Sequence, residues 1–160
     1  MKIKDFVPLI SILSAIILFT VFKQYYFEFS FQGAMIDFMA AFFLVFGFFK
    51  LINITKFAQA YRMYDSIAQY SNLYAHAYPC IEIGLGLCYL FRIQLFAVNI
   101  ITFVLMSINS IGVYIALQKK ETLMCACLGS LFKLPMTYVT LAENLIMGLM
   151  ALVMIVMGIK

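Results

Sequence analysis

Apolar residues along this chain come in long unbroken runs, which short polar segments separate. Polar and apolar positions do not alternate within the runs, which excludes a membrane β-barrel. A run of about 20 apolar residues can cross a bilayer as an α-helix. The pattern therefore predicts five membrane-spanning helices, at Phe6 to Phe22, Met35 to Ile52, Leu73 to Phe91, Leu95 to Leu117 and Leu141 to Ile159.

Most of the connecting segments are short. Lys23 to Ala34 predicts a small loop, and Arg92 to Gln94 predicts a tight hairpin. The segment from Asn53 to Asn72 is longer and has apolar residues at helical spacing, so we expect an amphipathic helix on the membrane surface. The residues that carry this spacing are Phe57, Tyr61, Tyr64 and Ala68.

The composition agrees with an all-α integral membrane protein. Of the 160 residues, 66% are hydrophobic and 11% are charged, whereas soluble domains have about 25% charged residues. The sequence contains no low-complexity tract and no linker to a soluble domain. Its charges are sparse and dispersed, so we expect a lipid bilayer and no nucleic acid among its partners.

The first apolar run has two interpretations. Lys2 and Lys4 precede it, as in a secretory signal peptide. No small-x-small cleavage motif follows it; the aromatic cluster from Lys23 to Phe27 does, and this suits the membrane interface. We therefore predict a retained helix that spans the membrane.

The positive charges predict the orientation. With five crossings, eight lysines and arginines lie on the side of the N-terminus and three on the other side. The positive-inside rule then places the N-terminus and the Gln118 to Thr137 segment in the cytoplasm. The eight are Lys2, Lys4, Lys50, Lys56, Arg62, Lys119, Lys120 and Lys133; the three are Lys23, Arg92 and Lys160.

The segment from Gln118 to Thr137 holds the strongest candidate for chemistry, the pair Cys125 and Cys127 next to Gly129. Neighbouring lysines favour the thiolate, the form that attacks disulfides or binds metal. Cα atoms two residues apart are separated by about 7 Å in an extended chain, the limit for a disulfide. A disulfide between these cysteines would therefore be strained and would exchange readily.

Other candidate residues gather at the same predicted surface. His76 and Cys80 are four residues apart on one helical face, and Glu143 opens the last span. Each also has a structural interpretation: His76 bonded to a backbone carbonyl, Cys80 and Cys88 in packing, and Glu143 in a capping box with Thr140.

Glu82 lies within a predicted membrane helix, where a carboxylate is costly and indicates function or a buried partner. Lys50, at the end of an earlier span, is the expected partner, although its side chain could also extend to the headgroups. In the fourth span, polar residues share one face and are expected to bond to neighbouring helices or to line a polar path. These residues are Asn99, Thr102 and Asn109, with Met106.

Two further patterns concern the last spans. Met147, Met150, Met154 and Met157 form a stripe that could carry Cu(I) from the cysteine loop, or could simply fill gaps between helices. Gly84 and Gly86 would permit the close approach of a neighbouring helix.

Three stretches in order resemble the MauE family, a DoxX-like group of redox-associated bacterial membrane proteins. Gly47 to Leu51 resembles its G-x-x-K-L motif, and Pro79 to Gly84 its P-x-x-E-x-G motif. Cys125 to Gly129 resembles its Cys-x-Cys-x-Gly segment. The resemblance covers about residues 35 to 158.

This resemblance implies a four-helix membrane domain over residues 35–160, after an N-terminal helix and loop over residues 1–34. It also implies the bacterial inner membrane and thiol chemistry with a partner protein. Two functions stay open: thiol–disulfide exchange through Cys125 and Cys127, or heavy-metal binding by these cysteines with Cys80 and His76. An accessory subunit without chemistry is a third. The sequence shows no quinone, flavin or haem motif.

Overall fold

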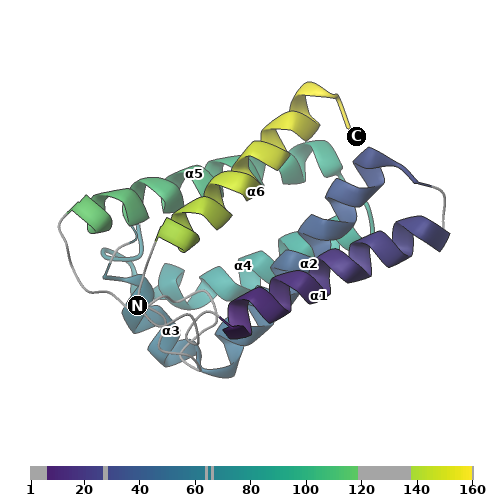
Figure 1. The fold of residues 1–160 in the computed structure, drawn as a ribbon. Helices are drawn as coiled ribbons and strands as arrows, with labels where there is room; N and C mark the ends of the chain where they lie inside the picture. The colour runs from purple at the N-terminus through teal and green to yellow at the C-terminus, as the bar shows by residue number, and fades with distance from the viewer. Residues whose placement is uncertain (1–6, 27–28, 64, 66, 119–137, 160) are drawn as a thin grey trace.

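The computed structural model describes residues 7–26, 29–63, 65, 67–118 and 138–159. Across this part of the chain the regular structure is entirely helical (Figure 1). The helices are α1 (Val7–Tyr26), α2 (Phe31–Ile52), α3 (Ile54–Tyr61), α4 (Asn72–Leu90), α5 (Leu95–Gln118) and α6 (Tyr138–Val156).

The five predicted spans coincide with the five long helices. Three of these, α1, α2 and α5, are long and apolar enough to cross a membrane. The apolar part of α6 is shorter, and α4 contains His76 and Glu82. The helices thus support a multi-pass membrane protein, whereas the number of five crossings stays a prediction.

The connection between α1 and α2 is much shorter than the predicted loop from Lys23 to Ala34. α1 continues to Tyr26, and α2 begins at Phe31. The hydroxyl of Ser30 accepts a hydrogen bond from the backbone N–H of Gly33 at 3.4 Å, so that Ser30 caps α2. A cap of this kind satisfies a free N–H at the start of a helix, and it lets α2 begin earlier than its apolar run.

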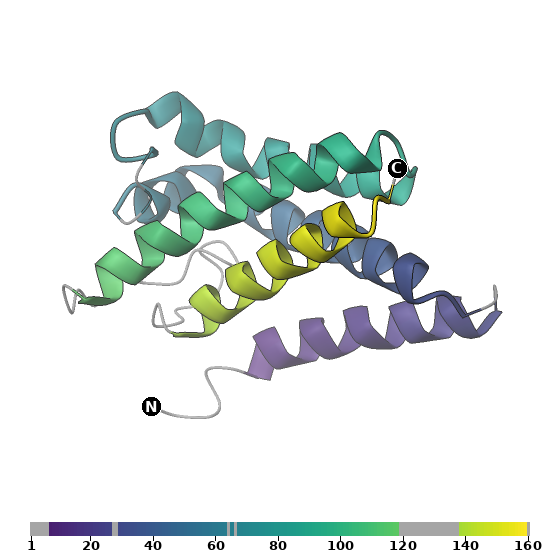
Figure 2. The same ribbon diagram turned by 90° about the horizontal axis from the view of Figure 1, so that it is seen from above.

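The long helices form two pairs, α2 beside α4 and α5 beside α6, and α1 lies along the outside of α2 (Figures 1 and 2). One end of the bundle, the loop end, holds α3, the start of α4, the end of α5 and the start of α6. The opposite end, the turn end, holds the α1–α2 connection and the α4–α5 turn. The pairs meet around fully buried side chains that include Met39, Phe43, Tyr89, Met106, Met147 and Met154.

Two glycines let α2 and α4 approach closely. A Cβ atom on Gly86 would lie 3.0 Å from the backbone nitrogen of Leu44, and one on Gly47 would lie 2.9 Å from Cγ1 of Ile83. The predicted role of Gly86 is confirmed. The same prediction is wrong for Gly84, where a Cβ would meet nothing within 4 Å.

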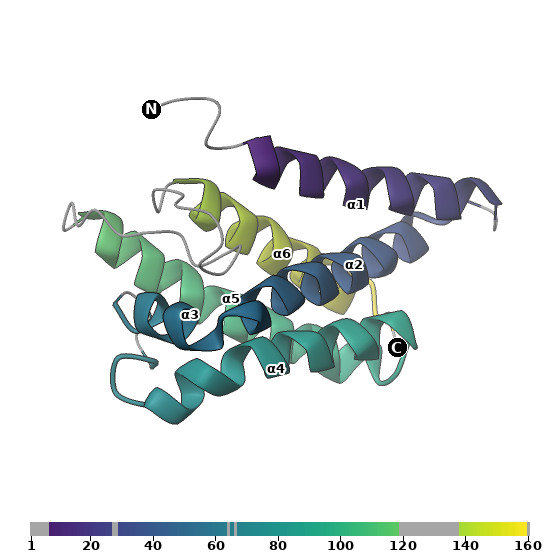
Figure 3. The same cartoon turned by 90° about the horizontal axis from the view of Figure 1, so that it is seen from below.

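The segment after α2 differs from the predicted surface helix in length and in the face it buries. Its helix, α3, ends at Tyr61, and turns follow it. Phe57, Tyr61 and Ala68 are buried in one cluster with residues of α4. Figure 3 shows α3 beside the first part of α4. The apolar face predicted to contact lipid therefore contacts protein. Tyr64 lies outside the described residues.

The polar face of α5 is buried, as predicted. The hydroxyl of Tyr89 on α4 bonds the side chains of Asn99 and Thr102, at 2.8 and 3.0 Å. Asn109 bonds Tyr61 and Tyr78 from α3 and α4. These bonds join the two helix pairs in a region where apolar contacts alone give little specificity.

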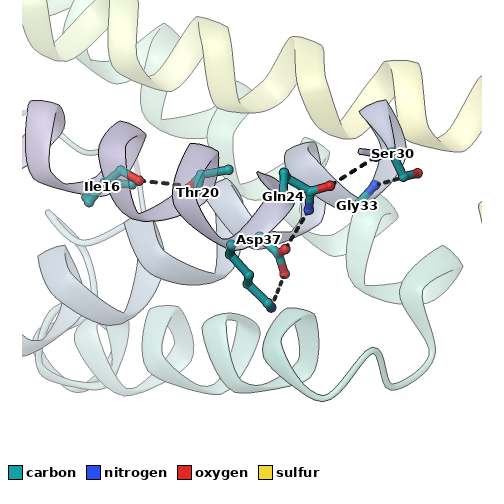
Figure 4. Close-up of polar contacts among 7 residues, drawn as sticks. Ile16, Thr20, Gln24, Ser30, Gly33 and Asp37 are labelled. Atoms are coloured by element: carbon teal, nitrogen blue, oxygen red, sulfur yellow. Dashed lines mark hydrogen bonds and ion pairs between the residues drawn. The ribbon is translucent and has the colours of Figure 1, made fainter. Parts of the chain in front are cut away.

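α1 is fastened to α2 through Asp37, which the apolar pattern did not predict. Lys23 donates to one carboxylate oxygen of Asp37 at 2.7 Å, and the amide of Gln24 donates to the other at 2.9 Å (Figure 4). The backbone N–H of Ser30 donates to the Gln24 side chain at 3.0 Å. The sequence does contain a sign of this contact, because Asp37 lies inside an apolar run and Lys23 precedes that run.

The two glycines of α4 provide a matched test of its packing against α2. We expect Gly86→Ala to lower stability by about 1–3 kcal/mol, because the added methyl group forces Leu44 to move. Gly84→Ala should leave stability unchanged or raise it by up to about 1 kcal/mol, since alanine is the better helix former. SDS-induced unfolding of the purified protein measures both. Equal effects would contradict the close approach at Gly86.

Candidate functional site

A buried ion pair lies between α2 and α4 toward the loop end. Nζ of Lys50 lies 2.5 Å from Oε1 and 2.6 Å from Oε2 of Glu82. The side chains are only 10% and 3% exposed, so each charge is compensated mainly by the other. Removing either partner would leave an uncompensated buried charge. The pairing expected from the sequence is present.

Two aromatic rings also lie close to the ammonium group of Lys50. Its Nζ lies 5.6 Å from the ring centre of Phe57 and 5.1 Å from that of Tyr78. Both distances suit cation–π attraction, which strengthens when water is excluded. α3 therefore contributes to the site through Phe57, and this explains why its apolar face turns inward.

A chain of hydrogen bonds leads from the ion pair toward the start of α4. The hydroxyl of Tyr78 bonds the Glu82 carboxylate and accepts from Nδ2 of Asn109. Oδ1 of Asn109 accepts from the hydroxyl of Tyr61 at 2.7 Å, and Tyr61 bonds Tyr74. Because the Tyr78 hydroxyl uses its proton toward the Glu82 carboxylate, it accepts from the amide of Asn109, and this orients the Asn109 oxygen toward Tyr61.

A small polar cavity lies beside this chain. Its volume is about 30 Å³, enough for a water molecule. It brings together side chains from five helices, because α6 also reaches it through its first two turns. The lining residues are Lys50, Phe57, Tyr61, Tyr78, Asn109, Thr140 and Asn144.

Two of these helices, α5 and α6, are the anchors of residues 119–137. Cys125, Cys127 and Gly129 lie in that segment, outside the described residues. Their roles therefore stay predictions. The structure does place both anchors at the loop end, with Asn109 and Thr140 on the same cavity.

The remaining candidates are placed separately. Pro79 is buried inside α4, where it lacks a backbone N–H to donate. Glu143 is buried in α6. The predicted capping box is wrong in its position, because α6 begins at Tyr138 and Thr140 lies inside the helix.

Of the alternative metal ligands, His76 and Cys80 lie on α4, and Cys125 and Cys127 lie outside the described residues. Nδ1 of His76 lies 2.8 Å from the carbonyl oxygen of Asn72. This contact agrees with the structural role expected for His76, a hydrogen bond to a backbone carbonyl. Cys80 is exposed and Cys88 is half-buried. Within the described residues, no three His, Cys, Asp or Glu side chains are placed to hold a metal ion. Met147 and Met154 pack in the core, as expected for gap-filling side chains.

Tyr61 and Tyr78 were not expected as partners of the ion pair. Tyr78 directly precedes Pro79 in the motif that contains Glu82, and Tyr61 lies on the face assigned to the membrane surface. Tyrosines near the ends of membrane helices are common at the interface. Their type and position therefore gave no reason to expect a buried network.

The sequence matches the family model described as "Methylamine utilisation protein MauE" over residues 28–157. No curated protein and no solved structure matches the chain. The matched part contains α2 to α6 and the cysteine segment, and it leaves α1 outside. The chain belongs to the MauE family, and its apolar helices agree with a multi-pass membrane protein.

The ion pair predicts an unusual pattern of stabilities. Lys50→Met should cost about 3–5 kcal/mol, because it leaves the Glu82 carboxylate buried and unpaired. The double variant Lys50→Met/Glu82→Leu removes both charges and should be more stable than the single variant. Unfolding in SDS gives the comparison.

Lys56→Met is the matched control, since Lys56 is an exposed lysine on neighbouring α3. It should change stability by less than about 1 kcal/mol. A double variant no more stable than Lys50→Met would show that the two charges do not depend on each other.

Proposed function

We propose that this MauE-family protein exchanges disulfides with a partner protein through Cys125 and Cys127. One observation carries the proposal: the helices on both sides of the cysteine segment both line the small cavity beside Lys50. The lysines close to the cysteines in sequence favour thiolates. The family is named for methylamine utilisation, whereas the cysteine pair of this chain favours thiol chemistry and gives no indication of that substrate.

The exchange needs no cofactor. One thiolate of the pair attacks a disulfide of the partner, forms a mixed disulfide and releases one partner thiolate. The second cysteine then attacks the mixed disulfide, which closes the Cys125–Cys127 bond and releases the second partner thiolate. The partner gains two electrons and the pair loses them. The two protons of the cysteine thiols pass to the two partner thiolates, and a dithiol protein restores the pair by the reverse steps.

In this proposal the ion pair and its network position the loop. Val113 and Ala116 near the end of α5 form one buried cluster with Leu141 near the start of α6, so the two ends of the loop are attached to helices that pack together. Lys50, Glu82 and Pro79 are thus positioning residues. Glu143 is buried near the start of α6, and Gly129 is proposed as part of the cysteine segment itself.

The setting we propose is the inner membrane of a bacterium, with a first helix ahead of the family domain predicted at residues 35–160. The first helix of that domain, α2, begins earlier than predicted, at Phe31. The distribution of lysine and arginine supports a cytoplasmic position for the N-terminus and the cysteine segment. The partner would then be a thiol-redox protein that reaches the cytoplasmic membrane surface.

Single cysteine variants should trap the partner. In cells with Cys125→Ser or Cys127→Ser, the remaining cysteine can form the mixed disulfide but cannot resolve it. Alkylation with N-ethylmaleimide followed by non-reducing electrophoresis should show an adduct that dithiothreitol removes, in at least one variant. Mass spectrometry then identifies the partner.

Cys80→Ser and Cys88→Ser are the controls, because both retain the pair and should give no added adduct. If neither Cys125→Ser nor Cys127→Ser forms a thiol-sensitive adduct, disulfide exchange by this pair is excluded. Stoichiometric Cu(I) binding that is lost in the double cysteine variant would then favour metal handling.

A further inference from the structure

A second polar region lies at the turn end of the bundle, opposite the ion-pair site. A cavity of about 550 Å³ opens there between the end of α1, the start of α2 and the α4–α5 turn. This is within the usual size range of small-molecule sites. Its lining is rich in hydrogen-bonding groups: Lys23, Gln24, Ser30, Gln32, Asp37 and Arg92.

One wall of this cavity is held rigidly. Asp37 has a side chain only 2% exposed, and both of its oxygens are occupied by Lys23 and Gln24 (Figure 4). Gln24 also receives the backbone N–H of Ser30. The ammonium group of Lys23 has two further N–H donors, and its side chain is 31% exposed. It can therefore donate to a ligand without leaving Asp37.

The other wall contributes the charge of Arg92. This side chain is exposed, and no hydrogen bond or ion pair involves its guanidinium group within the described residues. Its backbone has φ 55°, in the left-handed region. Glycine is the usual residue where a helix ends in this conformation. An arginine there accepts a conformational cost, and it places a cation at the cavity.

Charge and depth then indicate the ligand. Lys23 and Asp37 neutralise each other, so the described lining keeps the positive charge of Arg92. Exposed aromatic residues surround this end, as at a membrane interface: Tyr25, Tyr26, Phe29 and Phe91. In the headgroup region of a membrane, phosphate is the common anion. Arginine can bind a phosphate group through two parallel hydrogen bonds.

We propose that this cavity is an oxyanion site which binds a phosphate group, with Arg92 and Lys23 as its charged ligands and Gln32 as a further donor. Two residues of the fixed wall, Lys23 and Gln24, belong to α1. They lie outside residues 28–157, the part of the chain that matches the family. The bound phosphate would therefore join α1 to the family domain. The site is independent of the Lys50–Glu82 ion pair, which lies toward the other end of the bundle.

Native mass spectrometry of the full-length protein in detergent tests the proposal. Phosphatidylglycerol should bind, whereas diacylglycerol with the same chains but no phosphate should not. Arg92→Gly should reduce the occupancy by phosphatidylglycerol about tenfold, the usual scale for a lost charge-assisted contact. Glycine suits φ 55°, so this variant should fold at least as well as the native protein.

Two variants and one competitor complete the test. Arg92→Lys should retain part of the binding, and Lys56→Ala, which removes an exposed lysine at the loop end, should retain all of it. Displacement of the lipid by millimolar inorganic phosphate would identify a site that also accepts free phosphate; resistance to it would identify a lipid headgroup site. Equal binding by the native protein and Arg92→Gly, or equal binding of diacylglycerol, would overturn the proposal.

Discussion

A lysine and a glutamate buried together between two helices impose the main constraint on this structure. The Lys50–Glu82 pair lies between α2 and α4 with both side chains at most 10% exposed. Each charge is tolerated only beside the other. The close approach of the two helices at Gly47 and Gly86 allows this contact. α3 then folds back, because Phe57 completes the surroundings of the ammonium group.

The same constraint extends to the second helix pair. Tyr78 connects the carboxylate to Asn109 on α5, and the small cavity next to it adds Thr140 and Asn144 from α6. The start and end of the cysteine segment are therefore attached to helices that share one polar centre. In the proposed exchange, the polar centre positions the helices that carry the cysteine segment, and the thiols of Cys125 and Cys127 react. The phosphate site at the turn end is separate, since it depends on α1 and Asp37.

Apolar runs predicted the long helices well, because a membrane helix needs little beyond length and apolarity. The ion pair was also predictable, since an acid and a lysine inside apolar runs need partners. The start of α2 was not predictable from the apolar pattern, because the hydrogen bond from Gly33 to the Ser30 side chain sets it. The inward face of α3 was missed because lipid and protein cores select the same apolar side chains. Tyr61, Tyr78 and Asp37 were missed because their partners are distant in sequence.

The redox state of Cys125 and Cys127 in living cells is the decisive measurement for disulfide exchange. Cells are quenched with acid, free thiols receive a mass tag, and peptide mass spectrometry counts the tags, with Cys88 as the half-buried reference. Disulfide exchange predicts a partly oxidised pair whose oxidised fraction follows the redox state of the cell, while Cys88 stays reduced. A pair that remains fully reduced under every condition would contradict the proposed exchange.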